Sequence, residues 1–139
     1  MRLRTLATAF LFGCLSVGTL SCASAPNIPA REMPAGATFS GLWYTNFGDM
    51  QLTQKADGYT RGTFDYKSGG EVEGKVEGGV FTFDWVQFGD FQVGRREVRG
   101  KGYLVISDDG LHMEGEWGYK DSYAGGGKWE GNKATEIYR

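Results

Sequence analysis

The sequence predicts an all-β protein, an eight-stranded antiparallel up-and-down β-barrel. From Phe39 onward apolar and polar residues alternate with a period of two, which is typical of strands whose two faces differ in environment. Pairs such as Asp57-Gly58, Gly78-Gly79 and Asp109-Gly110 interrupt the alternation and favour hairpin turns. Glycines also recur every few residues, and each would weaken a helix interior by about 1 kcal/mol. We therefore expect strands and no helix.

Eight segments carry this alternation and are joined mostly by short turns. The expected strands are 39–46, 49–55, 59–67, 71–77, 80–88, 101–107, 111–118 and 127–133. Strands joined by tight turns pair with their neighbours, and closure of the sheet removes exposed edges that would favour aggregation. The sequence therefore predicts one closed barrel domain over residues 39–139.

One face of the expected strands is apolar and is assigned to the barrel interior. Its members are Trp43, Met50, Leu52, Phe64, Val72, Val76, Phe81, Phe83, Trp85, Leu104, Ile106, Met113 and Trp117. The interior of an eight-stranded barrel is either just filled by side chains or holds one small ligand. The aromatic members are therefore core or pocket wall. Gly62, Gly74 and Gly115 share the interior face and are expected to leave room there.

The N-terminal residues predict an export signal, residues 1–21, rather than part of the fold. A basic start with Arg2 and Arg4 precedes an apolar stretch from Leu6 to Leu20. This stretch is shorter than the roughly 20 apolar residues of a membrane-spanning helix, and it ends in small residues.

Processing of this signal determines the expected location. Leu20-Ser21-Cys22 resembles the lipobox of bacterial lipoproteins, which implies a palmitate-bearing lipid anchor on Cys22. The protein would then lie in the cell envelope, and Ala23 indicates the outer membrane. Cleavage after Ala25 instead would give a periplasmic or secreted protein. Residues 22–38 contain all three prolines, which predicts a mobile tether between anchor and barrel.

Charge and cysteine content exclude some classes of protein. The chain has 15 basic and 17 acidic residues, and loss of Arg2 and Arg4 with the signal leaves a net charge of about −4. Nucleic acid is therefore not an expected partner, because phosphate binding needs an excess of Lys and Arg. Both cysteines, Cys14 and Cys22, lie in or beside the signal, so the barrel has no disulfide and depends on its core.

Three stretches carry a family resemblance. They are SGLWYTNFGDMQLTQKADGYTRGTF over residues 40–64, VFTFDW ending in Trp85, and MEGEW ending in Trp117. Together they resemble the opening strands, a mid-barrel strand and the seventh strand of the avidin and streptavidin family. The resemblance covers about residues 40–131 and implies an avidin-like, calycin-type scaffold. A Gly-x-Trp start is also typical of lipocalins.

The resemblance does not extend to the biotin-binding groups. Where avidins place an Asn and a Ser for the ureido group, this chain has Thr45 and Asp49, and the Tyr and Ser of the third strand correspond to Phe64 and Tyr66. A polar ligand group left unpaired in a dry pocket costs about 1–3 kcal/mol. The resemblance therefore implies the scaffold without its usual ligand, and biotin stays a minor alternative.

The expected binding site consists of interior aromatic residues and polar neighbours at the barrel mouth. The candidate residues are Trp43, Thr45, Phe64, Tyr66, Trp85 and Trp117. We expect Thr45, Tyr66 and Trp85 to line the mouth. This composition predicts a small, mostly apolar or aromatic ligand and no cofactor.

Catalysis and metal binding lack a sequence signal. The single histidine, His112, falls on the outer face beside Glu114, and no serine lies in a Gly-x-Ser-x-Gly elbow. Asp108-Asp109-Gly110 predicts a turn, because a calcium loop needs more oxygen ligands at fixed spacing. We therefore expect a protein that is not an enzyme and holds no metal.

One basic stretch supports an alternative function. GRREVRGKG, residues 94–102, places Arg95, Arg96 and Arg99 in an otherwise acidic domain, where they invert the local field. Such a loop would contact an acidic envelope protein, as in a periplasmic inhibitor that acts through its loops rather than its interior. A solvated loop tip is the other interpretation.

Overall fold

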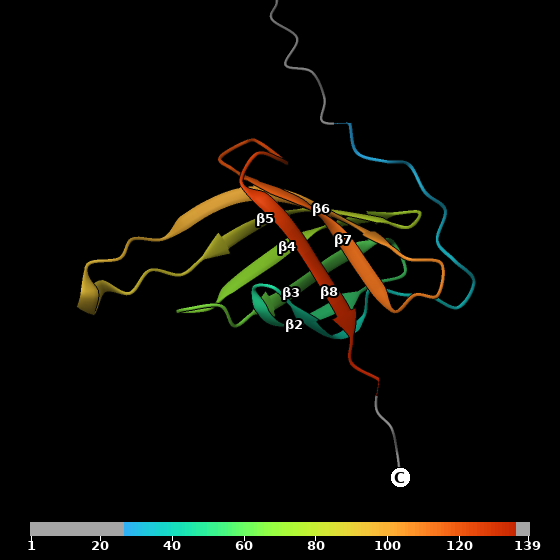
Figure 1. Cartoon of the computed structure of the whole chain (residues 1–139), viewed down its shortest axis with the longest axis horizontal. Coiled ribbons are helices and arrows are strands. Elements are labelled where there is room, and N and C mark those ends of the chain that lie inside the picture. The colour runs from blue at the N-terminus through green and yellow to red at the C-terminus, as the bar shows by residue number, and fades with distance from the viewer. Residues whose placement is uncertain (1–26, 136–139) are drawn as a thin grey trace, which may run out of the picture.

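Eight antiparallel strands form a closed barrel in the computed structural model, which describes residues 27–135 (Figure 1). The strands are β1 (Gly41–Thr45), β2 (Gly48–Gln54), β3 (Tyr59–Phe64), β4 (Gly70–Glu77), β5 (Val80–Gln87), β6 (Val98–Ile106), β7 (His112–Tyr119) and β8 (Gly127–Lys133). Each strand pairs with its neighbour in the chain, and β1 closes the barrel on β8 with Trp43 opposite Lys133. The predicted eight-stranded antiparallel up-and-down barrel is confirmed.

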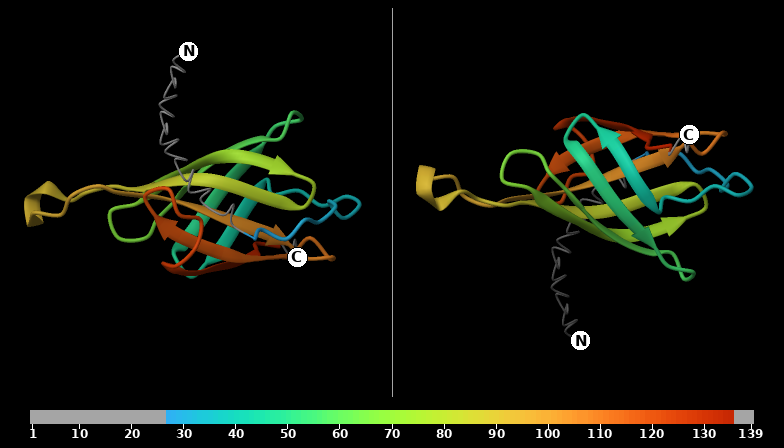
Figure 2. Two further views of the ribbon diagram at one scale, coloured as in Figure 1. Left: turned by 90° about the horizontal axis from the view of Figure 1, so that it is seen from above. Right: turned by 90° about the horizontal axis from the view of Figure 1, so that it is seen from below.

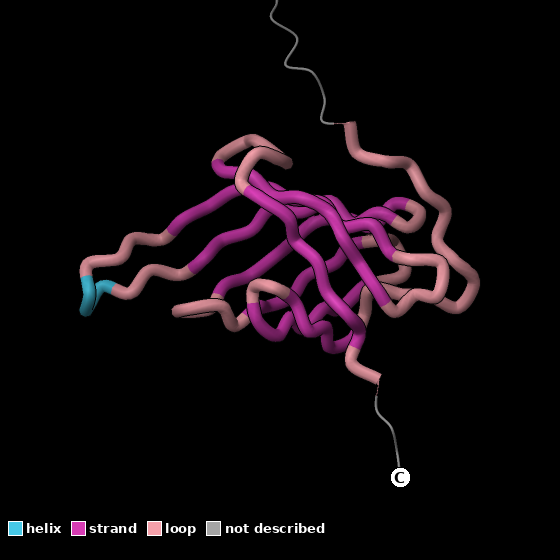
Figure 3. The backbone as a smooth tube through the Cα atoms, viewed as in Figure 1, coloured by secondary structure: helices cyan, strands magenta, loops and turns pink. Residues whose placement is uncertain are grey.

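Helical structure is confined to one short turn. A 3₁₀ turn, Phe91–Val93, lies at the tip of the connection between β5 and β6 (Figure 3). Within residues 27–135 no helix has the length and apolar character needed to cross a membrane. The expectation of strands without α-helix therefore holds for this part of the chain.

The interior of the barrel is a single aromatic and aliphatic core. Every residue assigned to the interior face is buried except Trp117, which is half-buried. Phe39 and Trp129 belong to the same core, with 0% and 3% of their surface exposed. The period-two pattern therefore assigns the faces correctly, because successive side chains of a strand point to opposite sides.

Interior glycines bring atoms closer instead of leaving space. A Cβ at Gly102 would lie 2.7 Å from the Phe83 ring, and one at Gly100 would lie 2.6 Å from the Trp85 ring. At Gly62, Gly74 and Gly115 a Cβ would collide with backbone carbonyl oxygens of the adjoining strands, those of Gln51, Thr82 and Tyr103. The expectation of free room at these three glycines is therefore wrong.

The segment of residues 31–39 covers one end of the barrel (Figure 2). The Phe39 ring lies inside this end, with its centroid 5.8 Å from that of Phe81. The Trp43 indole donates a hydrogen bond to the Phe39 carbonyl at 2.8 Å. Lys133 Nζ donates one to the Thr38 carbonyl, also at 2.8 Å, which joins the segment to β8.

Further contacts hold the earlier part of this segment. The amide of Gly79, in the turn between β4 and β5, donates to the Arg31 carbonyl at 2.8 Å, and the Arg31 side chain pairs with Asp108. The segment expected as a tether, residues 22–38, therefore contacts the barrel along residues 31–38. Residues 22–26 lie outside the described part of the chain.

The opposite end of the barrel is open. The connection between β5 and β6, residues 88–97, projects from this end as an arm, drawn in yellow in Figure 1. β6 begins at Val98, three residues before the strand expected over residues 101–107, so the basic stretch of residues 94–102 is loop only through residue 97. Glycine has a low strand propensity, so Gly100 and Gly102 weakened the strand pattern in this stretch. In the barrel these two glycines are needed, because a side chain there would collide with the rings of Trp85 and Phe83.

We expect Phe39→Ala to lower the free energy of unfolding by about 3 kcal/mol, because it removes a fully buried ring from the closed end. Phe88→Ala is the matched control, since Phe88 is 40% exposed at the open end, and it should cost about 0.5 kcal/mol. Urea denaturation of both variants measures the difference. Equal losses would contradict the assignment of Phe39 as the residue that closes the barrel.

Candidate functional site

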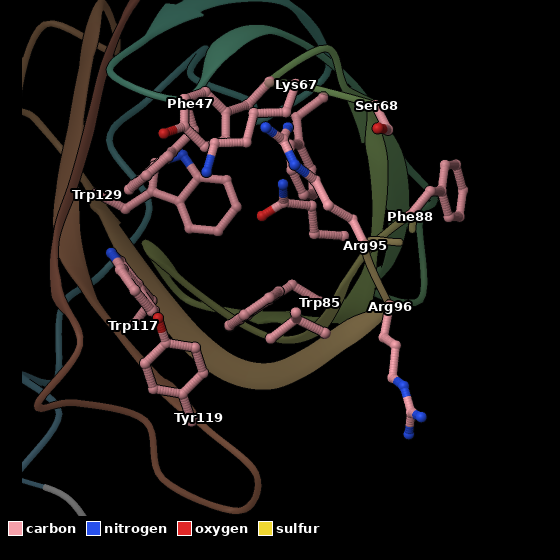
Figure 4. A pocket seen from close by; sticks show the side chains of 14 residues that line it. Phe47, Lys67, Ser68, Trp85, Phe88, Arg95, Arg96, Trp117, Tyr119 and Trp129 are labelled. Atoms are coloured by element: carbon pink, nitrogen blue, oxygen red, sulfur yellow. The ribbon is translucent and has the colours of Figure 1, made fainter. Parts of the chain in front are cut away.

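A cavity of about 460 Å³ lies at the open end of the barrel (Figure 4). It is walled by the ends of β3, β5, β6, β7 and β8 and by the loops that join the strands there. Its lining residues are Phe47, Phe64, Tyr66, Lys67, Ser68, Trp85, Gln87, Phe88, Arg95, Arg96, Val98, Trp117, Tyr119 and Trp129. We call this cavity the mouth pocket.

Aromatic rings in edge-to-face contact form the wall of the mouth pocket. Trp117 meets Trp85 with ring centroids 5.6 Å apart and Tyr119 with centroids 5.1 Å apart, both near perpendicular. Phe47 meets Trp129 at 5.0 Å on the other side. Such pairs stabilise by about 0.5–1.5 kcal/mol beyond the burial of their area, so the rings of the wall support one another.

The tight turn between β1 and β2 places Phe47 over the pocket. Thr45 Oγ1 accepts a hydrogen bond from the Phe47 amide at 3.0 Å and donates one to the Gly48 carbonyl at 2.7 Å. Gly48 has φ +81°, a left-handed conformation that glycine adopts without strain. The Phe47 ring is thereby directed back onto Trp117 and Trp129.

The structure divides the candidate binding residues into two groups. Phe64, Tyr66, Trp85 and Trp117 line the mouth pocket. Trp43 and Thr45 do not: Trp43 is fully buried toward the closed end, and the Thr45 hydroxyl is used within its own turn. The expectation that Thr45 lines the mouth therefore does not match the structure.

The indole N–H groups of the wall differ in their partners. Trp85 Nε1 donates to the carbonyls of Lys101 and Gly118 at 3.1 and 3.2 Å, which ties β5 to β6 and β7. Trp117 Nε1 and Trp129 Nε1 are buried and have no hydrogen-bond partner among residues 27–135. Trp85 is thus a hydrogen-bonded structural member of the wall, and the other two indoles contribute through their rings.

The charged residues that border the mouth pocket are all basic. They are Lys67, Arg95 and Arg96, and the described lining contains no Asp, Glu, His or Cys. Figure 4 shows the Arg95 side chain reaching back over the pocket toward Lys67 and Phe47, whereas Arg96 points away from it. The third arginine of the basic stretch, Arg99, lies on the outer wall in β6 and pairs with Glu97 at 2.5 Å.

Three ionisable side chains whose pKa values are shifted, those of Tyr59, Lys101 and Tyr103, lie on the outer wall. The Tyr59 hydroxyl donates to Glu73 at 2.7 Å, and this bond raises the pKa of Tyr59. Lys101 donates to Asp84 at 2.5 Å, and the bond raises the pKa of Lys101. Burial, followed by a hydrogen bond to Glu116, raises the pKa of Tyr103. These pairs join neighbouring strands and do not face the mouth pocket.

The histidine and the acidic turn are also on the outside. His112 is exposed and hydrogen-bonded to Asn132 across β7 and β8. Asp109 accepts hydrogen bonds from the Ser107 hydroxyl at 2.5 Å and the Leu111 amide at 2.9 Å, which holds the turn and lowers the pKa of Asp109. Residues 27–135 contain no group of three or more His, Cys, Asp and Glu side chains arranged to hold a metal ion.

Several residues of the pocket wall were not predicted from the sequence, and only some of them could have been. Trp129 shares the interior parity of its strand with Gly131, so alternation alone was sufficient to find it. Phe47 lies just beyond β1, and only the turn geometry brings it inward. Lys67 takes a left-handed φ of 54° in the turn after β3, which no sequence pattern indicates.

Comparison of the chain with protein-family models, with curated protein sequences and with solved structures finds no match.

We expect Trp85→Phe to lower the free energy of unfolding by about 1 kcal/mol more than Trp117→Phe. Both changes shrink an indole in the same wall, but only Trp85 loses hydrogen bonds. Urea denaturation monitored by circular dichroism measures the difference. A loss at Trp117 as large as that at Trp85 would contradict the structural role assigned to the Trp85 N–H.

Proposed function

We propose that this protein is a non-enzymatic β-barrel of the bacterial cell envelope that binds a small, mostly apolar or aromatic ligand in the mouth pocket. The observation that carries the proposal is the open, ring-lined cavity of about 460 Å³ at one barrel end. Ligand pockets commonly occupy about 300–1,000 Å³ and have largely apolar walls with a few polar groups. An avidin-like or lipocalin-like relationship is consistent with a ligand held at the barrel end.

The contents of the mouth pocket favour binding over catalysis. General acid–base chemistry uses groups such as His, Asp or Glu within hydrogen-bond reach of a substrate. The described lining offers hydroxyl, amide and cationic side chains beside its rings, but no carboxylate, imidazole or thiol. The arrangement therefore supports recognition of a ligand by shape and apolar contact.

The asymmetry of the barrel suits attachment through the N-terminus. Residues 31–39 cover the end opposite the mouth pocket, so attachment to a membrane through the N-terminus would leave the mouth pocket uncovered. The anchor itself is proposed from the Leu20-Ser21-Cys22 motif, which lies outside the described residues.

A second candidate function is an interaction module or inhibitor that acts through loops. The projecting arm of residues 88–97 favours it, because Val93 near the arm tip is 62% exposed and Arg95 and Arg96 follow. In this alternative the arm would enter a partner protein and the mouth pocket would have no role in binding. Titration with a neutral apolar probe separates the two functions.

We expect the neutral fluorescent probe N-phenyl-1-naphthylamine to bind in a saturable manner with one site per chain. Gln87 faces the mouth from β5, so Gln87→Trp should fill the pocket and weaken the probe about tenfold, a change of about 1.4 kcal/mol. Gln51→Trp, on the exposed outer face of β2, is the matched control and should leave the affinity unchanged. No saturable binding, or equal binding by Gln87→Trp, would overturn the pocket function and favour the arm.

We expect the full chain, produced in a bacterium that makes lipoproteins, to incorporate a fatty-acid analogue at Cys22 and to fractionate with membranes. Cys22→Ser should lose the label, because a hydroxyl does not replace the modified thiol, whereas Cys14→Ser should keep it. Gel analysis of metabolically labelled cells reports the result. Absence of label from the unaltered chain would refute the anchor without affecting the pocket.

A further inference from the structure

The basic rim of the mouth pocket indicates more than an apolar ligand. Lys67 and Arg95 place cationic side chains at this rim, and the described lining contains no carboxylate, in a chain whose net charge is −2. We propose that the pocket selects small organic anions, whose apolar body lies against the aromatic wall and whose carboxylate, sulfonate or phosphate group is held at the mouth by Arg95. This inference rests on the proposed ligand-binding function.

The arm holds Arg95 in place through its backbone. The Arg95 amide donates to the Asp90 carbonyl at 2.8 Å, and the Val93 amide donates to the same carbonyl at 3.2 Å. Asp90 Oδ1 accepts from the Gln92 amide at 3.1 Å, which closes the arm tip. Gly89 lets the two legs of the arm approach, since a Cβ there would lie 2.6 Å from the Arg95 carbonyl oxygen.

This backbone frame gives adjacent arginines opposite orientations. The Arg95 side chain extends over the cavity, and the Arg96 side chain extends away from it (Figure 4). Arg99 lies farther along β6 and is engaged by Glu97. Among residues 27–135, no carboxylate lies within ion-pair distance of Arg95, so its guanidinium is available to a ligand.

A guanidinium over an aromatic cavity discriminates by charge. Its planar fork matches a carboxylate or phosphate in two parallel hydrogen bonds. The rings of Trp85, Trp117 and Tyr119 below it exclude water from the body of the ligand, which strengthens the ionic contact. A neutral ligand of the same shape gains only the apolar contacts, and a cationic one is repelled by Arg95 and Lys67.

A matched pair of probes tests this selectivity. The probes are 8-anilinonaphthalene-1-sulfonate and N-phenyl-1-naphthylamine, which share one ring skeleton and differ by the sulfonate. We expect Arg95→Gln to weaken the sulfonate probe about fivefold and to leave the neutral probe unchanged. Arg96→Gln removes the same charge from the same loop and should change either affinity less than about twofold.

Two further measurements test whether the probes bind inside the mouth pocket and whether the sulfonate makes an ionic contact. Gln87→Trp should weaken both probes, because it fills the cavity they share. Raising the sodium chloride concentration to about 0.5 M should weaken the sulfonate probe and not the neutral one, because salt screens the ionic contact. Arg61→Gln, on the exposed outer face of β3, controls for the loss of a positive charge far from the mouth.

The outcomes separate this inference from the function on which it rests. Saturable binding of the neutral probe that is blocked by Gln87→Trp, with no effect of Arg95→Gln on the sulfonate probe, would overturn the anion selectivity and keep the ligand pocket. Absence of saturable binding by both probes would overturn both. Equal weakening of the sulfonate probe by Arg95→Gln and Arg96→Gln would also overturn the inference, because it would show a diffuse field rather than a contact from Arg95.

A vesicle measurement distinguishes a soluble anion from a lipid headgroup. We expect the exported domain, produced without residues 1–26, not to sediment with phosphatidylglycerol vesicles while it binds the sulfonate probe. Sedimentation that Arg95→Gln and Arg96→Gln reduce equally would assign the basic rim to a membrane surface and would contradict selection of a small anion. Circular dichroism of this shortened chain confirms that the barrel has folded.

Discussion

The width of the barrel is the constraint on which the rest of the structure depends. Eight strands enclose an interior that ordinary side chains nearly fill, yet this chain places many large rings inside it. The rings fit because glycines face them: Phe83 lies against Gly102, Trp85 against Gly100, and Phe64 against Gly70. Ring and glycine positions thus form one packing unit, and adding a methyl group at these glycines would displace an aromatic ring or a neighbouring strand.

The interior is filled at one end of the barrel and partly empty at the other. At one end Phe39, carried by the N-terminal segment, fills the interior beside Trp43 and Phe81. At the other end Trp85 packs against Trp117, and Trp129 packs against Phe47 and Phe83. Among residues 27–135 no segment fills the cavity that these rings border. The cavity is therefore the part of the aromatic core that the described chain leaves unfilled, so the rings that stabilise this end of the barrel are also the ones that line the mouth pocket.

The open end of the barrel differs from the outer wall in its charged side chains. Outer-wall pairs such as Lys101 with Asp84 place acids and bases side by side across neighbouring strands. At the mouth only basic groups approach the rings, and Arg95 is brought there by the backbone of the arm. An apolar interior beneath a cationic rim is the arrangement on which the proposed selection of small organic anions rests.

The sequence by itself determined the strands, their order and the interior face, because period-two alternation and Gly-containing turns are local signals that each strand carries independently. It also placed Phe64, Tyr66, Trp85 and Trp117 among the residues of a ring-lined barrel end. Only the tertiary structure decided which end is open, since this depends on Phe39 and residues 31–38 folding back over the barrel. It also separated Arg95 from Arg96, because turn geometry and backbone hydrogen bonds, rather than residue type, set where adjacent identical side chains point.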